Sequence, residues 1–225
     1  MAEHKSSHPA SQGPMFVIAM GVSGTGKSTL GAAVAKALGL PFIDGDDLHP
    51  PKNIDKMSHG IPLNDDDRRP WLGAIRQSAQ RTIAEQESAD RAYKTRHGVV
   101  IACSALKKAY RDILRGLPPV PSTNGKTYNA NGKRDNADTD DDNTWSASEC
   151  PVYFVYIDGT REEIYRRMLA RQNHFMKADM LDSQLNALEV PIGEPGVIPV
   201  PLIDSIEDQA RKAIEGLTAL WRNNN

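Results

Sequence analysis

The sequence has few cysteines and no long apolar run. Only two cysteines occur in 225 residues, Cys103 in an apolar run and Cys150 beside a polar stretch. This count excludes a disulfide framework and a cysteine-based zinc pattern. No apolar run approaches the roughly 18 residues that a membrane-spanning helix needs. We therefore expect a cytoplasmic protein without a membrane partner.

An excess of charge of one sign is also missing. The 27 basic and 29 acidic residues leave a formal net charge of -2. A protein with this balance has no broad basic field to collect nucleic acid or anionic lipid. We therefore expect no nucleic-acid partner, and any anionic ligand would be held by local groups.

Two segments lack the pattern of a folded domain. Residues 1–14 are polar and rich in His, Ser and Pro, without the apolar core or the arginines of a targeting peptide, so we expect a disordered tail. Residues 117–150 are dominated by Asn, Asp, Gly, Ser, Thr and Pro, which predicts a low-complexity surface insertion. The remainder, within residues 15–221, has the length of a single α/β domain.

The strongest motif is the stretch Gly21–Ser28, which has the form G-x-x-x-x-G-K-S. The apolar run 15–20 precedes it as a predicted buried strand, and an amphipathic helix follows. Its glycines allow backbone N–H groups to face an anion, Lys27 can reach the β- and γ-phosphates, and Ser28 offers an oxygen to Mg²⁺. The alternative is an ordinary glycine-rich turn before a helix.

Strands and helices alternate along the rest of the chain. This order favours a parallel sheet with helices on both faces. The expected strands are 15–20, 40–43, 99–103, 152–157 and, as an edge strand, 196–200. The first expected helix directly follows the glycine-rich motif, and three others are expected over 50–60, 105–115 and 180–188. Three more are indicated by their capping residues: one starts after Asn64, one at the capping box of Thr160, and one runs from Asp204 or Ser205 to Leu220.

Two carboxylates, Asp44 and Asp46, follow the second predicted strand, at the sheet edge where ligands of α/β proteins bind. On an extended segment, side chains two residues apart point the same way. One carboxylate could then hold Mg²⁺, and the other could orient or deprotonate a substrate hydroxyl. The alternative is a turn with solvated aspartates.

Two arginines, Arg167 and Arg171, lie four residues apart on one predicted helix. They precede the segment 172–177, which breaks the helical pattern and suggests a lid. Arginines that close over ATP would neutralise charge on the transferred phosphoryl group. A solvated basic helix face is the other interpretation.

Basic residues also gather in the segments expected around the pocket, and such a cluster suits a small anionic acceptor. They are Lys52, Lys56, Arg68, Lys107, Lys108 and Arg111. The acidic triplet Asp65–Asp67 has two interpretations, capping of its helix or a direct part in catalysis.

The order of several motifs resembles the phosphate-loop gluconate kinases. The similarity runs from about Phe16 to Arg115 and from Val152 to about Leu188. It rests on the segments Met20–Ser28, Asp44–Pro50, Pro62–Arg68, Pro70–Leu72, Cys103–Asp112 and Asn173–Met176.

This resemblance implies a three-layer α/β/α kinase fold with a central parallel five-stranded sheet, a substrate-binding helical segment and a lid. It implies ATP-dependent phosphorylation of D-gluconate at the 6-hydroxyl, feeding the pentose phosphate pathway, by an enzyme that is often a homodimer. By analogy with the related shikimate kinases, Asp44 would serve Mg²⁺, Asp46 would approach the acceptor hydroxyl, and Arg68 would bind the carboxylate.

The motif and the resemblance together predict a set of site residues. Lys27, Asp46 and Arg171 are the predicted catalytic residues, and Ser28 and Asp44 are the predicted metal ligands. The predicted nucleotide-binding residues are Gly21, Val22, Ser23, Gly24, Thr25, Gly26, Lys27, Ser28, Thr29, Arg167 and Arg171. The predicted substrate-binding residues are Asp46, His49, Asn53, Lys56, Arg68, Lys107 and Arg111.

Two other functions stay open at this stage. One is a kinase of the same fold for another small hydroxy acid or a nucleotide. The other is an inactive nucleotide-binding regulatory protein, although the motif residues such as Lys27 and Asp46 are present.

Overall fold

The computed structural model describes residues 13–89, 96–117, 150–170 and 178–223. Most of the predicted N-terminal tail and of the predicted insertion lies outside these ranges. The same is true of Arg171 and of the predicted lid segment up to residue 177.

A parallel sheet of five strands, in the order β2-β3-β1-β4-β5, forms the centre of the molecule. The strands are β1 (Met15–Met20), β2 (Phe42–Asp44), β3 (Gly98–Ala102), β4 (Val152–Asp158) and β5 (Val197–Pro201). All four neighbouring pairs are parallel. The predicted α/β fold is therefore confirmed, with β5 as the predicted edge strand.

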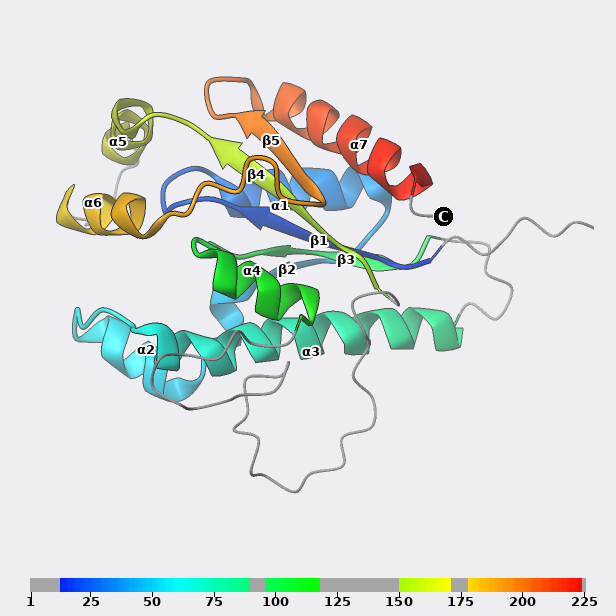
Figure 1. The fold of residues 1–225 in the computed structure, drawn as a ribbon, viewed down its shortest axis with the longest axis horizontal. Helices are drawn as coiled ribbons and strands as arrows, with labels where there is room; N and C mark the ends of the chain where they lie inside the picture. The colour runs from blue at the N-terminus through cyan, green and yellow to red at the C-terminus, as the bar shows by residue number, and fades with distance from the viewer. Residues whose placement is uncertain (1–12, 90–95, 118–149, 171–177, 224–225) are drawn as a thin grey trace, which may run out of the picture.

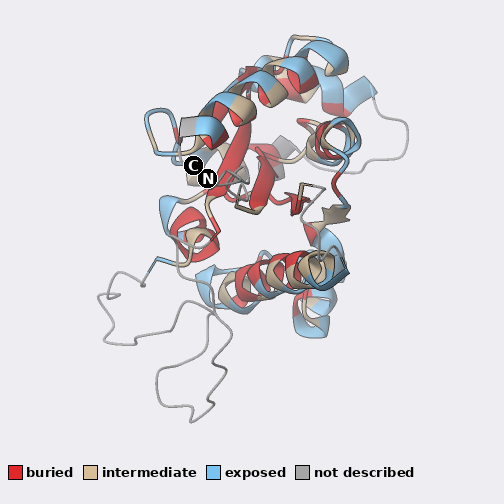
Figure 2. Ribbon diagram, turned by 90° about the vertical axis from the view of Figure 1, so that its right-hand side faces the viewer, coloured by how far each residue is buried: buried red, intermediate tan, exposed pale blue. Residues whose placement is uncertain are grey.

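Helices cover both faces of this sheet (Figure 1). On one face lie α1 (Lys27–Leu38) and α7 (Ile206–Asn223), and on the other lie α3 (Asp65–Ala89) and α4 (Lys108–Arg115). Alternate residues of β1 enter the two cores, Met15 and Val17 on the α1 side and Phe16 and Ile18 on the α3 side. Figure 2 shows the buried strands between the two helical layers, as expected for a parallel sheet.

The remaining helices lie near the end of the molecule where the strands finish (Figure 1). They are α2 (Pro51–Ser58), α5 (Arg161–Ala170) and α6 (Ala178–Ala187). Within the described ranges, no helix combines the length and the apolar character required to cross a membrane.

Three predicted helix starts are confirmed by their hydrogen bonds. The Asn64 Oδ1 atom accepts from the Asp67 N–H at 2.9 Å, and Ser205 Oγ accepts from the Asp208 N–H at 3.1 Å. At Thr160 the capping box is complete, because the Thr160 N–H donates to Glu163 Oε2 at 2.8 Å and Thr160 Oγ1 accepts from the Glu163 N–H at 3.3 Å.

The helix predicted over 105–115 begins later than expected, at Lys108. Ala105 has a φ of 46°, in the left-handed region that a helix cannot include. The carbonyls of Ala105 and Leu106 both accept hydrogen bonds from Arg111, at 2.9 and 3.0 Å. The residues before α4 therefore form a fixed loop instead of a first helical turn.

Candidate active site

The phosphate loop connects β1 to α1 and has the shape of an anion cradle. Gly24 and Gly26 have φ values of 86° and 95°, which glycine adopts without strain. Thr25 Oγ1 donates to the Val22 carbonyl at 2.8 Å and closes the loop on itself. A Cβ atom at Gly24 would lie 2.6 Å from Met168 Cγ, so glycine is required where α5 packs on the loop. This backbone cradle at a helix N-terminus fits a nucleotide polyphosphate.

The polar side chains of the loop face different partners. Lys27 Nζ donates to the Val22 carbonyl at 3.2 Å, and Thr29 is exposed on the first turn of α1. Ser28 Oγ donates to Asp44 Oδ2 at 2.7 Å. The two predicted metal ligands are thus brought together, and their hard oxygen atoms suit Mg²⁺.

Asp46 lies in a single 3-10 turn, Gly45–Leu48, which directly follows β2. The expectation of an extended Asp44–Asp46 segment is therefore wrong. Gly45, the first residue of the turn, lies so close to β3 that an added Cβ would be 2.3 Å from the Ala102 carbonyl oxygen, so only glycine fits there. The Asp46 N–H donates to Asp44 Oδ1 at 3.1 Å, so one carboxylate of the pair also caps the turn that carries the other.

Trp71 of α3 holds the turn in place through two contacts. Its Nε1–H donates to the Gly45 carbonyl at 2.7 Å, and its ring stacks on His49 with ring centroids 4.1 Å apart. Burial lowers the pKa of His49 despite the nearby Asp46, so the imidazole is neutral near pH 7. His49 therefore supports the turn through stacking.

Two further predicted substrate ligands, Asn53 and Lys56, belong to the group of residues that holds the turn Gly45–Leu48 and the start of α3 together. The buried Asn53 donates from Nδ2 to the Asp67 carbonyl at 2.8 Å and lies 3.3 Å from His49 Nδ1. Lys56 Nζ contacts both Asp67 carboxylate oxygens at 2.7 Å. None of these three predicted ligands lines the pocket described next.

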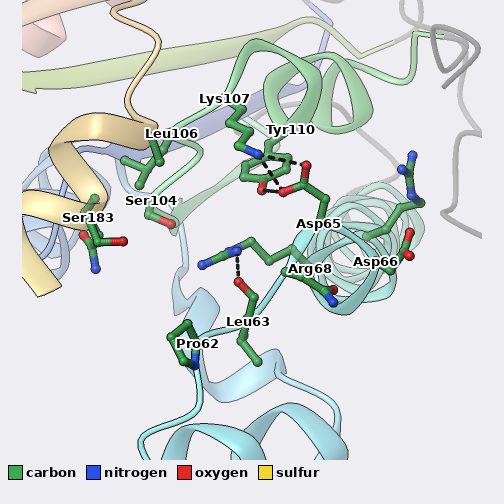
Figure 3. A pocket seen from close by; sticks show the side chains of 14 residues that line it. Pro62, Leu63, Asp65, Asp66, Arg68, Ser104, Leu106, Lys107, Tyr110 and Ser183 are labelled. Carbon is green, nitrogen blue, oxygen red and sulfur yellow. Dashed lines mark hydrogen bonds and ion pairs between the residues drawn. The ribbon is translucent and has the colours of Figure 1, made fainter. Parts of the chain in front are cut away.

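A pocket of about 570 Å³ opens between the start of α3, the loop after β3 and α6 (Figure 3). It is lined by Pro62, Leu63, Asn64, Asp65, Asp66, Arg68, Arg69, Ser104, Leu106, Lys107, Tyr110, Ser183, Gln184 and Ala187. Two predicted substrate ligands, Arg68 and Lys107, are among them, whereas Asp46 is not. Arg68 donates to the Leu63 carbonyl, and in Figure 3 its guanidinium extends toward the space between Ser104 and Pro62.

Asp65 joins Lys107 and Tyr110 on one wall of this pocket (Figure 3). Both Asp65 oxygens lie 2.8 Å from Lys107 Nζ, and the Tyr110 hydroxyl donates to Oδ1. Burial raises the pKa of the Asp65 carboxyl, but these hydrogen bonds outweigh it and hold the pKa below its ordinary value. Asp65 is therefore ionised near neutral pH and balances the charge of Lys107. Of the acidic triplet, Asp67 has the capping role, because its Oδ2 atom accepts a hydrogen bond from the Asn64 N–H at 3.1 Å.

Arg111, a predicted substrate ligand, lies inside the protein and not on the pocket surface. Its side chain is 0% exposed. It pairs with Glu194, at 3.0 Å from Nε and 2.5 Å from Nη2, and holds the Ala105 and Leu106 carbonyls. The guanidinium thus already binds a carboxylate of the protein.

Arg167 lies on the exposed side of α5 and donates to the Leu202 carbonyl, in the connection between β5 and α7. The structure therefore places Arg167 at that connection, while Arg171 is beyond the described end of α5.

One contact at the site has no signal in the sequence. Gln184 of α6 accepts a hydrogen bond at Oε1 from the Ser23 N–H of the phosphate loop, at 2.7 Å, and also lines the pocket. Tyr110 is a second pocket residue that the sequence alone did not single out. In α6 and α4 each of them is one polar residue among several, and only the tertiary contact distinguishes them.

Comparison with known proteins identifies relatives over most of the chain. Residues 23–116 match the family described as shikimate kinase. The chain is 38% identical over 206 residues to the thermosensitive gluconokinase of Escherichia coli, covering 90% of this chain and 88% of that protein. It is 38% identical over 210 residues to a probable gluconokinase of Rattus norvegicus, with 91% and 98% covered.

A solved structure supports the same relationship. The crystal structure of a gluconokinase from Sinorhizobium meliloti aligns with a TM-score of 0.67 and 38% identity, covering 94% of this chain and 95% of that one. The shared fold and this identity over nearly the whole length agree with the motifs at the site. The chain belongs to the gluconokinase family.

Proposed function

We propose that this protein transfers the γ-phosphoryl group of ATP to the 6-hydroxyl of D-gluconate, giving 6-phospho-D-gluconate and ADP. The observation that carries the proposal is a polar pocket with Arg68 in its wall that adjoins the phosphate loop through Gln184. The names of the relatives support gluconate as the acceptor. The product, 6-phospho-D-gluconate, would then feed the pentose phosphate pathway.

The donor side of the site is the loop Gly21–Ser28. Its backbone N–H groups and Lys27 would bind the nucleotide phosphates, and Thr29 and Arg167 are further nucleotide-binding candidates. Ser28 and Asp44 would hold Mg²⁺, which neutralises charge on the phosphates when bound. Arg171 remains our proposed catalytic cation for the transferred phosphoryl group.

The acceptor side is organised by the turn that carries Asp46. Its carboxylate would orient the 6-hydroxyl and accept its proton as the new bond to phosphorus forms. The Gly45 contacts with β3 and Trp71 fix this turn before substrate arrives. Such positioning is the main contribution that a protein makes to phosphoryl transfer.

Arg68 is our proposed partner for the gluconate carboxylate. Lys107 lines the same pocket but is already paired with Asp65, so its net attraction for an anion is smaller. His49, Asn53, Lys56 and Arg111 are assigned indirect roles, because their polar groups contact other parts of the protein. We further propose that residues 15–221 act as one catalytic domain, in the cytoplasm and as a homodimer.

Replacing Arg68 tests the acceptor assignment. We expect Arg68→Met to raise KM for gluconate about 10- to 100-fold, the effect of losing a charged hydrogen bond, with little change in KM for ATP. Steady-state kinetics with each substrate varied in turn would measure both constants. Arg81→Met is the matched control, since Arg81 is exposed on the same helix and does not line the pocket. An unchanged KM for gluconate in Arg68→Met would remove Arg68 from the binding site.

A panel of acceptors tests the substrate. ADP release would be measured with gluconate, shikimate, other sugar acids and nucleoside monophosphates at equal concentration. We expect turnover with gluconate to exceed that with every other acceptor by at least about 10-fold, because a mismatch leaves buried polar groups unpaired. Preferred turnover of another acceptor would assign a different substrate to the same fold.

A further inference from the structure

Gln184 joins the two halves of the site through a single carboxamide. It lies on α6, 161 residues from Ser23 in the sequence, and its side chain is half-buried. Its Oε1 atom is 2.7 Å from the Ser23 backbone nitrogen, and its side chain also forms part of the pocket wall. It is therefore in contact with the donor loop and with the acceptor pocket at once.

The orientation of the carboxamide follows from its partner. A backbone N–H can only donate, so the atom that faces Ser23 must be the amide oxygen. The other end of the group is an NH₂, which has two hydrogens to donate and cannot accept. A ligand hydroxyl that meets Gln184 in the pocket would thus meet a hydrogen-bond donor whose position is set by the phosphate loop.

The distribution of charge in the pocket indicates which part of the substrate this would be. The charged residues of its lining belong to α3 and to the loop before α4, and they are Asp65, Asp66, Arg68, Arg69 and Lys107, whereas α6 contributes only Ser183, Gln184 and Ala187. In Figure 3, Ser183 lies across the pocket from Asp65 and Lys107. A substrate carboxylate is attracted to Arg68 on the charged wall, where Lys107 is already paired with Asp65, and this leaves the uncharged α6 wall for the hydroxyls of the polyol chain.

We propose that Gln184 is a substrate-binding residue whose Nε2 donates to the hydroxyl on C5 of the sugar acid, next to the hydroxyl that is phosphorylated. This inference rests on the proposed function. The contact with Ser23 places the Gln184 amide group beside the loop that would hold the ATP phosphates. A hydrogen bond from Nε2 to the substrate would therefore align the reacting end of the sugar acid with the γ-phosphate. Gln184 thereby selects acceptors with a hydroxyl at that place.

The test combines a variant with a substrate analogue. Turnover of D-gluconate and of 5-deoxy-D-gluconate would be measured with the wild-type protein and with Gln184→Met, which keeps the length of the side chain but cannot hydrogen-bond. In the wild type we expect the missing hydroxyl to reduce kcat/KM about 3- to 10-fold, the effect of one hydrogen bond. In Gln184→Met we expect the two substrates to differ by less than about 2-fold.

The comparison within one enzyme cancels any effect of the substitution on folding or on ATP binding. Asn186→Met is the control, because Asn186 is an exposed carboxamide on the same helix that does not line the pocket, and it should keep the wild-type ratio. If Gln184→Met does not fold, Gln184→Ala serves for the same ratio. Equal discrimination by the wild type and the variant would overturn the inference, whereas absence of gluconate turnover in the wild type would overturn the proposed function instead.

Discussion

Asp46→Asn is expected to reduce kcat for gluconate phosphorylation about 100- to 10,000-fold, the range typical of a lost general base. The amide keeps the size of the side chain but cannot take the proton of the acceptor hydroxyl. The turn itself should persist, because its hydrogen bonds use the Asp46 backbone and the Asp44 carboxylate. KM for ATP should therefore change little. Steady-state kinetics at saturating ATP would measure the effect.

Asp47→Asn provides a matched control. Asp47 is the next residue of the same 3-10 turn and is equally exposed. It should retain kcat within about 2-fold, because surface substitutions away from a site have small effects. If Asp46→Asn turned over at a near-normal rate, the assignment of Asp46 to the acceptor hydroxyl would be wrong.

Arg111→Met is expected to lower the free energy of unfolding by about 3–5 kcal/mol, the usual result of removing one partner of a buried ion pair. Arg111 is 0% exposed and the Glu194 side chain is only 16% exposed, so the remaining carboxylate would be poorly solvated and would keep Arg115, at 3.0 Å, but lose its two hydrogen bonds from Arg111. The substitution also frees the Ala105 and Leu106 carbonyls. Thermal unfolding should show a decrease in Tm of roughly 6–20 °C.

Two further variants separate this structural role from direct substrate binding. Adding Glu194→Gln to Arg111→Met should recover part of the lost stability, because Glu194 is then no longer a poorly solvated charge with only Arg115 to balance it, and Arg115 keeps its ion pair with Asp112. Arg211→Met, which removes an arginine with only exposed ion pairs, should change stability by less than about 1 kcal/mol. If Arg111→Met raised KM for gluconate without any loss of stability, Arg111 would bind the substrate, as the sequence predicts.

The fold could be predicted because its signals are local. The apolar run of β1 has the predicted bounds of 15–20, and the caps at Asn64, Thr160 and Ser205 are the residues that chemistry favours. In a parallel sheet the strands are buried on both faces and read as continuous apolar runs, so they are easily found. The sequence predicts that α4 starts at residue 105, three residues before its observed start at Lys108. The difference arises because Arg111, from within the fold, binds the carbonyl of Ala105, which has a left-handed conformation.

The site was predictable only where a motif specifies it. The phosphate loop and the pairing of Ser28 with Asp44 follow from a fixed spacing and a strand edge. The burial of Arg111 depends on Glu194, 83 residues away, and the role of Gln184 depends on Ser23, 161 residues away. No local pattern encodes such contacts, so a cation expected near a pocket could equally become part of the core.

The central claim is that the phosphate loop and the Asp46 turn act together on gluconate, and product analysis tests it most directly. The purified protein would be incubated with ATP, Mg²⁺ and D-gluconate, and ADP and the phosphorylated sugar acid would be quantified, with the position of the phosphate assigned by NMR. We predict equal amounts of ADP and 6-phospho-D-gluconate, and neither without gluconate. ADP release that does not depend on gluconate, or phosphate at another hydroxyl, would contradict the claim.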